Sequence, residues 1–288
     1  MPHKQIVVLY HSKCPDGFGA AYAAWKKFGD DAEYIPAKYG DHLPELAGRD
    51  VYLVDFSYET EAEMKKLEHE ASRLVVLDHH QSNQPLVEAV HEHVFDAQRS
   101  GATIAWKYFH PGEPMPLLFR ILEDGDLYRY SLPETRDIFS YLLAMPYEFP
   151  AWETLMQKLE DETGRKEIIT IAHNYTEYFY ALSKLSIDSA KLVTFEGYEC
   201  YFASTHPAMS MKSYVGHELA VKQAPLALVV TAHPDGYGVS IRGDGSVDVS
   251  KIAQKYGGGG HPNASGFFIP NGESMPWAEI GENENPRH

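Results

Sequence analysis

Short apolar runs alternate with amphipathic segments over roughly the first 110 residues, and this alternation most constrains the fold. The apolar runs are IVVLY (6–10), VYLVDF (51–56) and LVVLD (74–78), with weaker candidates at AEYIP (32–36) and HVFD (93–96). Continuous apolar runs of this length are typical of strands that are covered on both faces. Helical patterns stand between them, at 17–29, 60–71 and 100–109. Strand and helix in turn predict βαβ units and a mostly parallel sheet.

The pattern changes twice further along the chain. Residues 115–185 have helical periodicity, whereas 191–204, 225–233 and 237–243 have the patterns of strands, and glycine concentrates in GGGGHPNASGF (257–267). These shifts predict two domains. The first is an α/β domain with a helical connector at 1–185, and the second is smaller and β-rich, at 191–288.

Charge and composition exclude several classes of protein. The chain has 288 residues, 25 basic and 41 acidic side chains, and a formal net charge of −16. Such a surface repels polyphosphate backbones, so we expect no binding of long duplex nucleic acid, although one pocket could still hold a small anion. Two cysteines and the lack of a long apolar run predict a cytoplasmic protein with no membrane contact. The sequence does not indicate whether the protein is a monomer or an oligomer.

Acidic residues and histidines follow three of the predicted strands. His11 and Asp16 follow the first, Asp55 ends another, and the third ends in Asp78, His79 and His80. In a parallel sheet, ligands bind beyond the carboxyl ends of the strands, so these side chains are expected at one edge. An aspartate after a strand is often only a turn or cap residue, but three such ends together favour a metal site. Carboxylates with imidazoles suit Mn²⁺ best, with Mg²⁺, Fe²⁺ and Zn²⁺ as alternatives.

Two further acids follow an apolar segment in ILEDGDLYRY (121–130). Asp126 is the candidate for a fourth metal-binding carboxylate. Asp124 competes with it, because the two are equally acidic and only two residues apart.

Together these motifs resemble the DHH/DHHA1 phosphoesterases. The resemblance rests on HSKCPDGFGAA (11–21), VDFSY (54–58), the tripeptide DHH (78–80) and GGGGHPNASGF, in family order over nearly the whole chain. DHH alone is a weak signal, whereas DHH after a strand-end aspartate and before a distant GGGH is specific. The family includes RecJ-type exonucleases, nanoRNA and pAp phosphatases, cyclic-dinucleotide phosphodiesterases and polyphosphatases. The resemblance implies a DHH domain followed by a smaller α/β DHHA1 domain.

The resemblance also implies roles for individual residues. Asp55 is expected to bridge two ions, one of which is bound by Asp16, His79 and Asp126, and the other by His11. His80 is expected to face the substrate phosphate, and Asp78 to orient an imidazole. Water activated by metal is expected to attack phosphorus.

Cys14 departs from the family pattern, because many members have an aspartate at this position of the first motif. A thiolate could replace that carboxylate and would favour a softer metal. Alternatively, the first ion is loosely held by His11, Asp55 and water. One or two ions per chain are therefore expected.

The glycine-rich motif has the chemistry of a phosphate-binding loop. Glycines allow a ligand to approach backbone N–H groups closely, and a helix beginning near 262–265 would add favourable potential. A glycine-rich hairpin without a ligand is the alternative interpretation. The resemblance favours substrate binding, with the expected contacts being Arg242, Gly258, Gly259, Gly260 and His261.

The sequence thus predicts a metal-dependent phosphoesterase that hydrolyses phosphodiester bonds of short oligonucleotides or dinucleotides. Two alternatives stay open. One is a phosphatase of pAp or polyphosphate, which uses the same site. The other is a nucleotide-binding regulatory module with impaired catalysis, which the substitution at Cys14 suggests.

Overall fold

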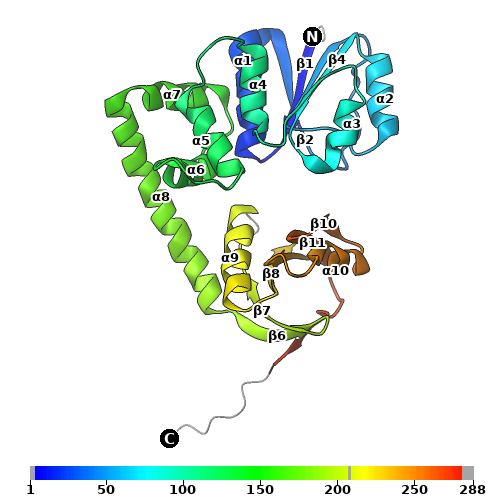
Figure 1. Cartoon of the computed structure of the whole chain (residues 1–288), viewed down its shortest axis with the longest axis vertical. Coiled ribbons are helices and arrows are strands. Elements are labelled where there is room, and N and C mark those ends of the chain that lie inside the picture. The colour runs from blue at the N-terminus through cyan, green and yellow to red at the C-terminus, as the bar shows by residue number, and fades with distance from the viewer. Residues whose placement is uncertain (1–3, 207–208, 281–288) are drawn as a thin grey trace, which may run out of the picture. The chain divides into compact units, whose positions relative to one another are not determined.

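The computed structural model describes residues 4–206 and 209–280, and these form two compact units that divide between Thr176 and Glu177 (Figure 1). The first unit is built on five parallel strands in the order β2-β1-β3-β4-β5. Their bounds are Ile6–His11 (β1), Ala32–Ala37 (β2), Asp50–Val54 (β3), Arg73–Asp78 (β4) and Glu92–Phe95 (β5). The expected parallel sheet is therefore confirmed.

Helices cover both faces of this sheet, as Figure 1 shows. The helices α1 (Pro15–Phe28) and α4 (Gly101–Phe109) lie on one face, with α2 (Glu61–Glu70) and α3 (Gln84–Glu88) on the other. Successive side chains of β1 point to opposite faces of the sheet. Val8 packs in the core with α1 and α4, while Val7 and Leu9 pack in the core with α2. All three are fully buried, which explains why the strand reads as one apolar run.

Two of these helices begin with a side-chain cap. At α2, the Thr60 hydroxyl accepts from the Glu63 N–H at 3.2 Å and donates to the Glu63 carboxylate at 2.6 Å. At α4, the Ser100 hydroxyl accepts from the Thr103 N–H at 3.3 Å. Each cap satisfies a backbone donor that the first helical turn leaves without a partner.

Four helices follow the parallel sheet. They are α5 (Leu117–Asp126), α6 (Thr135–Ala144), α7 (Phe149–Glu160) and α8 (Glu162–Asp188). Leu118, Ile138, Trp152 and Ile168 join the same core as α1 and α4, so this region belongs with the first unit. The helix α8 continues past Thr176 into the second unit. No helix in the described part of the chain combines the length and the apolar character needed to cross a membrane.

The second unit is a seven-stranded mixed sheet in the order β10-β11-β9-β8-β7-β6-β12, in which only β7 and β8 pair in parallel among the described strands. The strands are Lys191–Phe195 (β6), Tyr198–Ser204 (β7), Leu226–His233 (β8), Gly236–Gly243 (β9), Gly259–His261 (β10), Ala264–Pro270 (β11) and Ala278–Glu279 (β12). Two helices, α9 (Met209–Lys222) and α10 (Val249–Lys255), complete an α/β unit, as the resemblance implied.

No helix begins near 262–265, a possibility that the sequence had left open. Residues from Ala264 onward form β11, which pairs with β10 on one side and with β9 on the other. The glycine-rich segment is thus a hairpin. The prolyl-asparagine pair that resembles a helix start forms its turn, because pairing with β9 satisfies the backbone of the following residues.

Candidate metal centre

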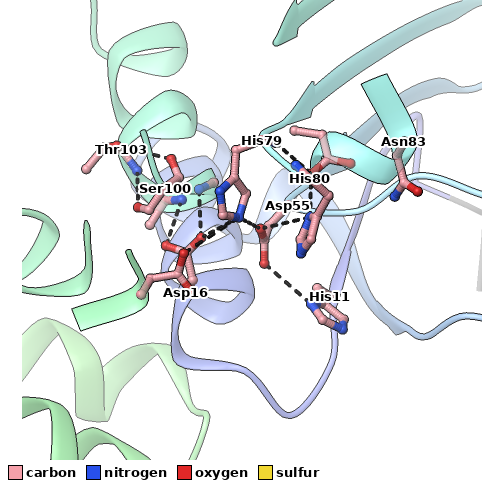
Figure 2. Close-up of polar contacts among 12 residues, drawn as sticks. His11, Asp16, Asp55, His79, His80, Asn83, Ser100 and Thr103 are labelled. Atoms are coloured by element: carbon pink, nitrogen blue, oxygen red, sulfur yellow. Dashed lines mark hydrogen bonds and ion pairs between the residues drawn. The ribbon is translucent and has the colours of Figure 1, made fainter. Parts of the chain in front are cut away.

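Seven donor residues, including Cys14 and His80, converge at the carboxyl edge of the parallel sheet. His11 ends β1, Asp16 lies in the first turn of α1, Asp55 follows β3, His79 follows β4, and Asp126 ends α5. Figure 2 shows His11, Asp16, Asp55 and His79 turned toward one another. Their ligand atoms form overlapping groups whose atoms lie within 4.8 Å of each other: His11 with Cys14 and Asp55, Asp55 with His79 and His80, and Asp16 with His79 and Asp126.

His79 is the centre of this convergence. Its Nε2 lies 3.1 Å from Asp55 Oδ1, 3.7 Å from Asp16 Oδ2 and 3.7 Å from Asp126 Oδ2. Burial by itself lowers the pKa of His79, but the three carboxylates raise it to about 10. In the absence of a cation, a proton on this imidazole therefore balances part of the acidic charge.

Asp55 is buried and lies between imidazoles. It is 1% exposed, and its Oδ1 lies 3.1 Å from His79 Nε2 and 3.9 Å from His80 Nδ1. On its other side, His11 Nδ1 lies 3.6 Å from Asp55 Oδ2. Burial raises the pKa of Asp55, but these three imidazoles lower the pKa by more, so the carboxylate stays ionised. A buried carboxylate is costly unless cations balance its charge, and a metal ion held by the same groups would do so.

Asp16 is held by the amino end of α4. Its Oδ2 accepts from the Gly101 N–H at 2.6 Å and its Oδ1 from the Ala102 N–H at 3.1 Å. Gly101 leaves room for this arrangement, since a Cβ there would stand 2.5 Å from Asp55 Oδ1. Burial, together with the charges of Asp126 and Asp55, raises the pKa of Asp16 well above its usual range. Both carboxylates are thus fixed against the first turn of α4.

Asp126 and Asp124 have different surroundings. The Asp126 carboxylate belongs to the cluster, and burial with the nearby Asp55 raises its pKa to about 6. Asp124 accepts hydrogen bonds from the N–H and hydroxyl of Ser131, the N–H of Leu132 and the hydroxyl of Thr135, at 2.5–3.0 Å. Asp124 therefore organises the loop after α5, and Asp126 is the acid that the structure brings to the cluster.

His80 is oriented by Asp78. Its Nδ1 lies 2.7 Å from the buried Asp78 Oδ1, which also accepts from the backbone N–H of His79 at 2.7 Å. Burial by itself lowers the pKa of His80, but Asp78 and Asp55 raise it. The side chain is 26% exposed, so its ring can be reached by a ligand.

Cys14 stands just before α1, with its sulfur in the group formed by His11 and Asp55. Burial and the charges of Asp55, Asp16 and Asp126 raise the pKa of its thiol well above the usual range. Without a cation the thiol keeps its proton at neutral pH, so it is not a free nucleophile.

Other residues at this edge were not predicted from sequence. Tyr39 packs its ring beside His11, with centroids 5.8 Å apart, and its hydroxyl accepts from the Asn83 side chain at 3.0 Å. Ser100 and Gly101 supply the amino end of α4 that holds Asp16. The predicted start of this helix directly after a strand could have indicated that its amino end lies at the same edge.

The predicted substrate-binding residues lie in the second unit. Arg242 on β9 and His261 on β10 both pair with Ala264 of the intervening β11, so they project from the same face of the sheet. Arg242 donates to the Ser213 hydroxyl on α9 at 3.0 Å. Burial and the charge of Arg242 lower the pKa of Lys212, so two cations share this region.

The three predicted glycines are not equivalent. A Cβ at Gly258 would lie 2.1 Å from the Gly266 carbonyl oxygen, and one at Gly260 would lie 2.7 Å from the Ala264 oxygen. Close packing within the hairpin therefore explains both. A Cβ at Gly259 would meet nothing within 4 Å, so protein packing does not explain this glycine.

Comparisons with known proteins agree with this architecture. The model of the DHHA1 domain matches residues 201–278. An uncharacterised protein of Acanthamoeba polyphaga mimivirus is 28% identical over 285 residues, which cover 91% of this chain and 66% of the relative. This chain thus spans about two thirds of the length of that relative.

Several solved structures share the fold at low sequence identity. The DHH domain of a member of a ribosomal-protein family has a TM-score of 0.56 at 16% identity, over 92% of this chain and 83% of its own. The pGpG-specific phosphodiesterase PggH of Vibrio cholerae has a TM-score of 0.54 at 13% identity, over 92% of this chain and 94% of its own. RecJ of Thermus thermophilus, in complex with Mn²⁺, has a TM-score of 0.51 at 14% identity, over 92% of this chain and 49% of its own.

Proposed function

We propose that this chain, whose residues 201–278 match the DHHA1 domain, is a DHH/DHHA1 phosphoesterase that depends on divalent metal and hydrolyses phosphodiester bonds of short oligonucleotides or linear dinucleotides. One observation carries the proposal above all. Asp55 is 1% exposed, its oxygens lie 3.1–3.9 Å from imidazole nitrogens of His11, His79 and His80, and donor atoms from four other elements surround it. Such a carboxylate is typical of a residue whose partner is a metal ion.

The donor set fits divalent cations. We propose that Asp16, His79 and Asp126 hold one ion, that His11 helps to hold a second, and that Asp55 bridges them. Carboxylates and imidazoles favour Mn²⁺, and the likeness in fold to a manganese-bound RecJ supports the same choice. When bound, the cations supply activation of water and stabilisation of the charge that develops on phosphorus.

His80 is proposed to contact the substrate phosphate. Asp78 holds its Nδ1 at 2.7 Å and thereby turns the opposite ring nitrogen outward. The raised pKa of His80 favours the imidazolium form. A protonated ring can donate a hydrogen bond to a phosphate oxygen and oppose its charge.

The second unit is proposed to bind another phosphate or the nucleotide of the substrate. Arg242 and His261 share a face, and the neighbouring Lys212 carries a lowered pKa, which an anion would reverse. The net charge of −16 opposes the approach of long polyanions. The likeness in fold to a pGpG-specific phosphodiesterase supports linear dinucleotides as the first class to test.

Hydrolysis of pApA, pAp, cyclic di-AMP and polyphosphate by the Mn²⁺-loaded protein tests this proposal. We expect conversion of pApA to AMP, lost in His79→Ala, with slower turnover of the others. Preferential hydrolysis of pAp or polyphosphate would establish the alternative phosphatase. A protein that binds Mn²⁺ but hydrolyses none of them would contradict the proposed activity.

A further inference from the structure

His11, Cys14 and Asp55 form a group of donors that differs in chemistry from the rest of the cluster. The Nδ1 or Nε2 of His11, the Sγ of Cys14 and a carboxylate oxygen of Asp55 lie within 4.8 Å of one another. Asp55 is 1% exposed, and the buried His11 Nδ1 lies 3.6 Å from its Oδ2. These two donors therefore meet other possible metal ligands and lie next to the sulfur.

Ordinary structural roles do not account for Cys14. It occupies the N-cap position of α1, where Ser, Thr, Asp or Asn normally accepts a backbone hydrogen bond, yet its side chain makes no capping hydrogen bond. It forms no disulfide. The backbone around it is tightly constrained, since a Cβ at Gly17 would lie 2.2 Å from the His11 carbonyl oxygen. This close turn carries the sulfur back toward His11 and Asp55.

The remaining donors contain no sulfur. Asp16, His79 and Asp126 offer two carboxylates and one imidazole, whereas His11, Cys14 and Asp55 offer one imidazole, one sulfur and one carboxylate. Thiolate sulfur shifts preference toward Zn²⁺, while carboxylate-rich sets suit Mn²⁺ and Mg²⁺. Three protein donors with one open position is also the pattern of catalytic zinc sites.

We propose that the Cys14 thiolate is a metal ligand, and that the centre is mixed, with Zn²⁺ held by His11, Cys14 and Asp55 and Mn²⁺ by Asp16, His79 and Asp126. Binding of Zn²⁺ displaces the thiol proton to solvent, so the sulfur binds as an anion. The amino end of α1 adds favourable potential for that anion. The proposal rests on the cation binding proposed above, and it assigns different metals to the two positions.

Cobalt spectroscopy tests the ligation directly. Co²⁺ bound to a thiolate has a charge-transfer absorption band in the near ultraviolet, whether or not the protein is active. We expect this band in the full-length wild type and in Cys200→Ala, whose cysteine is buried in β7 of the second unit. Cys14→Asp and Cys14→Ser should lack it. A wild type without the band, or a band that survives in Cys14→Ser, would overturn the proposal.

Competition between metals tests the selectivity. Metal-free protein is dialysed against Zn²⁺ and Mn²⁺ together, and the metal content per chain is measured. We expect one Zn²⁺ and one Mn²⁺ in the wild type and in Cys200→Ala. Cys14→Asp should lower the preference for Zn²⁺ over Mn²⁺ at the position formed by His11, residue 14 and Asp55 by at least about 10-fold. An unchanged ratio in Cys14→Asp would contradict the assignment.

The two proposals fail in different ways. Hydrolysis of pApA without a thiolate band would leave the phosphoesterase standing and remove Cys14 as a ligand. A thiolate band without hydrolysis of any phosphate ester would keep Cys14 as a ligand and remove the proposed activity. Metal content and absorption are thus measured separately from turnover.

Discussion

Asp55 has a backbone conformation that residues with side chains rarely adopt. Its φ is 54°, in the left-handed region, where Asn and Asp are the best tolerated after glycine. Strained residues of this kind persist where the surrounding structure fixes them, and they concentrate at functional sites. Here the strain coincides with a buried carboxylate that lies among the imidazoles of His11, His79 and His80. The proposed role of Asp55 in binding cations accounts for both features.

Replacement of Asp55 by asparagine separates the role of its charge from that of its backbone. Asparagine tolerates the left-handed conformation, so we expect Asp55→Asn to fold and to unfold near the wild-type temperature. Loss of the bridging carboxylate should lower kcat/KM for pApA by at least about 100-fold. Steady-state kinetics and calorimetry measure the two effects, and near-normal turnover would remove the bridging role.

The protonation of His79 and Asp126 predicts how cation affinity depends on pH. Without a cation, the pKa of His79 is about 10 and that of Asp126 about 6, and each proton must leave before a cation can bind. Affinity therefore rises with pH. Between about pH 6 and 8 at least the proton of His79 is displaced, so we expect Mn²⁺ binding to tighten by at least about tenfold per pH unit, with a steeper dependence below 6. Titration calorimetry in buffers of different ionisation enthalpy would count the protons, and release of none would contradict this.

At the scale of elements, α5 presents two acids to different surroundings. Residues two apart on a helix point about 200° apart, so Asp124 and Asp126 cannot serve the same site. The sequence could indicate that one of them faces the metal but not which, because that depends on how α5 packs. The Ser131 and Thr135 hydroxyls that hold Asp124 come from a loop and helix that follow it. Only the fold brings them together.

The two acids of α5 should respond oppositely to substitution. Asp124→Ala leaves buried donors without an acceptor, so we expect the free energy of unfolding to fall by about 2–4 kcal/mol. The hydrogen bonds of Ser131 and Thr135 outweigh burial and lower the pKa of Asp124 to about 2. Its contribution is therefore full above the unfolded pKa of about 4 and is lost as pH falls toward 2. Asp126→Ala should retain stability and lose turnover. Chemical denaturation and steady-state kinetics measure stability and turnover in both variants. A stable Asp124→Ala, or an Asp126→Ala with normal turnover, would contradict these roles.

The strand ends were predictable because an apolar run that stops at an aspartate or histidine is a local signal. The apolar runs at 6–10, 51–54 and 74–78 lie in β1, β3 and β4, and the acids and histidines at their ends lie at one edge of the sheet. The choice between a hairpin and a helix start at 259–270 could not be made in the same way. Its turn has the residues of a helix start, and pairing with β9, distant in sequence, decides the outcome. The helix α9 was also missed, since its apolar residues show little periodicity.

Gly259 offers a test of the hairpin as a binding element. A side chain there meets no protein atom, so we expect Gly259→Ala to unfold at the wild-type temperature. If a phosphate approaches this backbone closely, the methyl group should raise KM by about tenfold, the equivalent of one good hydrogen bond. A KM equal to that of the wild type would remove Gly259 from the proposed binding surface.

At the scale of the whole molecule, the chain divides its chemistry between two cores. All proposed metal ligands belong to the unit that ends at Thr176, and Arg242 and His261 belong to the unit that begins at Glu177. Separate hydrophobic clusters support the two units. Each set of residues is therefore positioned by its own core.

We expect Mn²⁺ to raise the thermal unfolding temperature of the first unit but not that of the second. A cation that binds only the first unit stabilises it by about 2.7 kcal/mol when free Mn²⁺ is about 100 times Kd. For a unit of this size, we expect its transition to rise by about 5–10 °C. The transition of the second unit should not move. Scanning calorimetry with and without Mn²⁺ measures both, and an equal shift of the two transitions would show that metal binding involves both units.

The proposed donors all lie between His11 and Asp126. A polypeptide leaves the ribosome amino end first, and its domains generally fold as units in that order. The full donor set has therefore been synthesised while the residues after Thr176 are still being added. Loading with metal can accordingly begin on the nascent chain, before the second unit is complete.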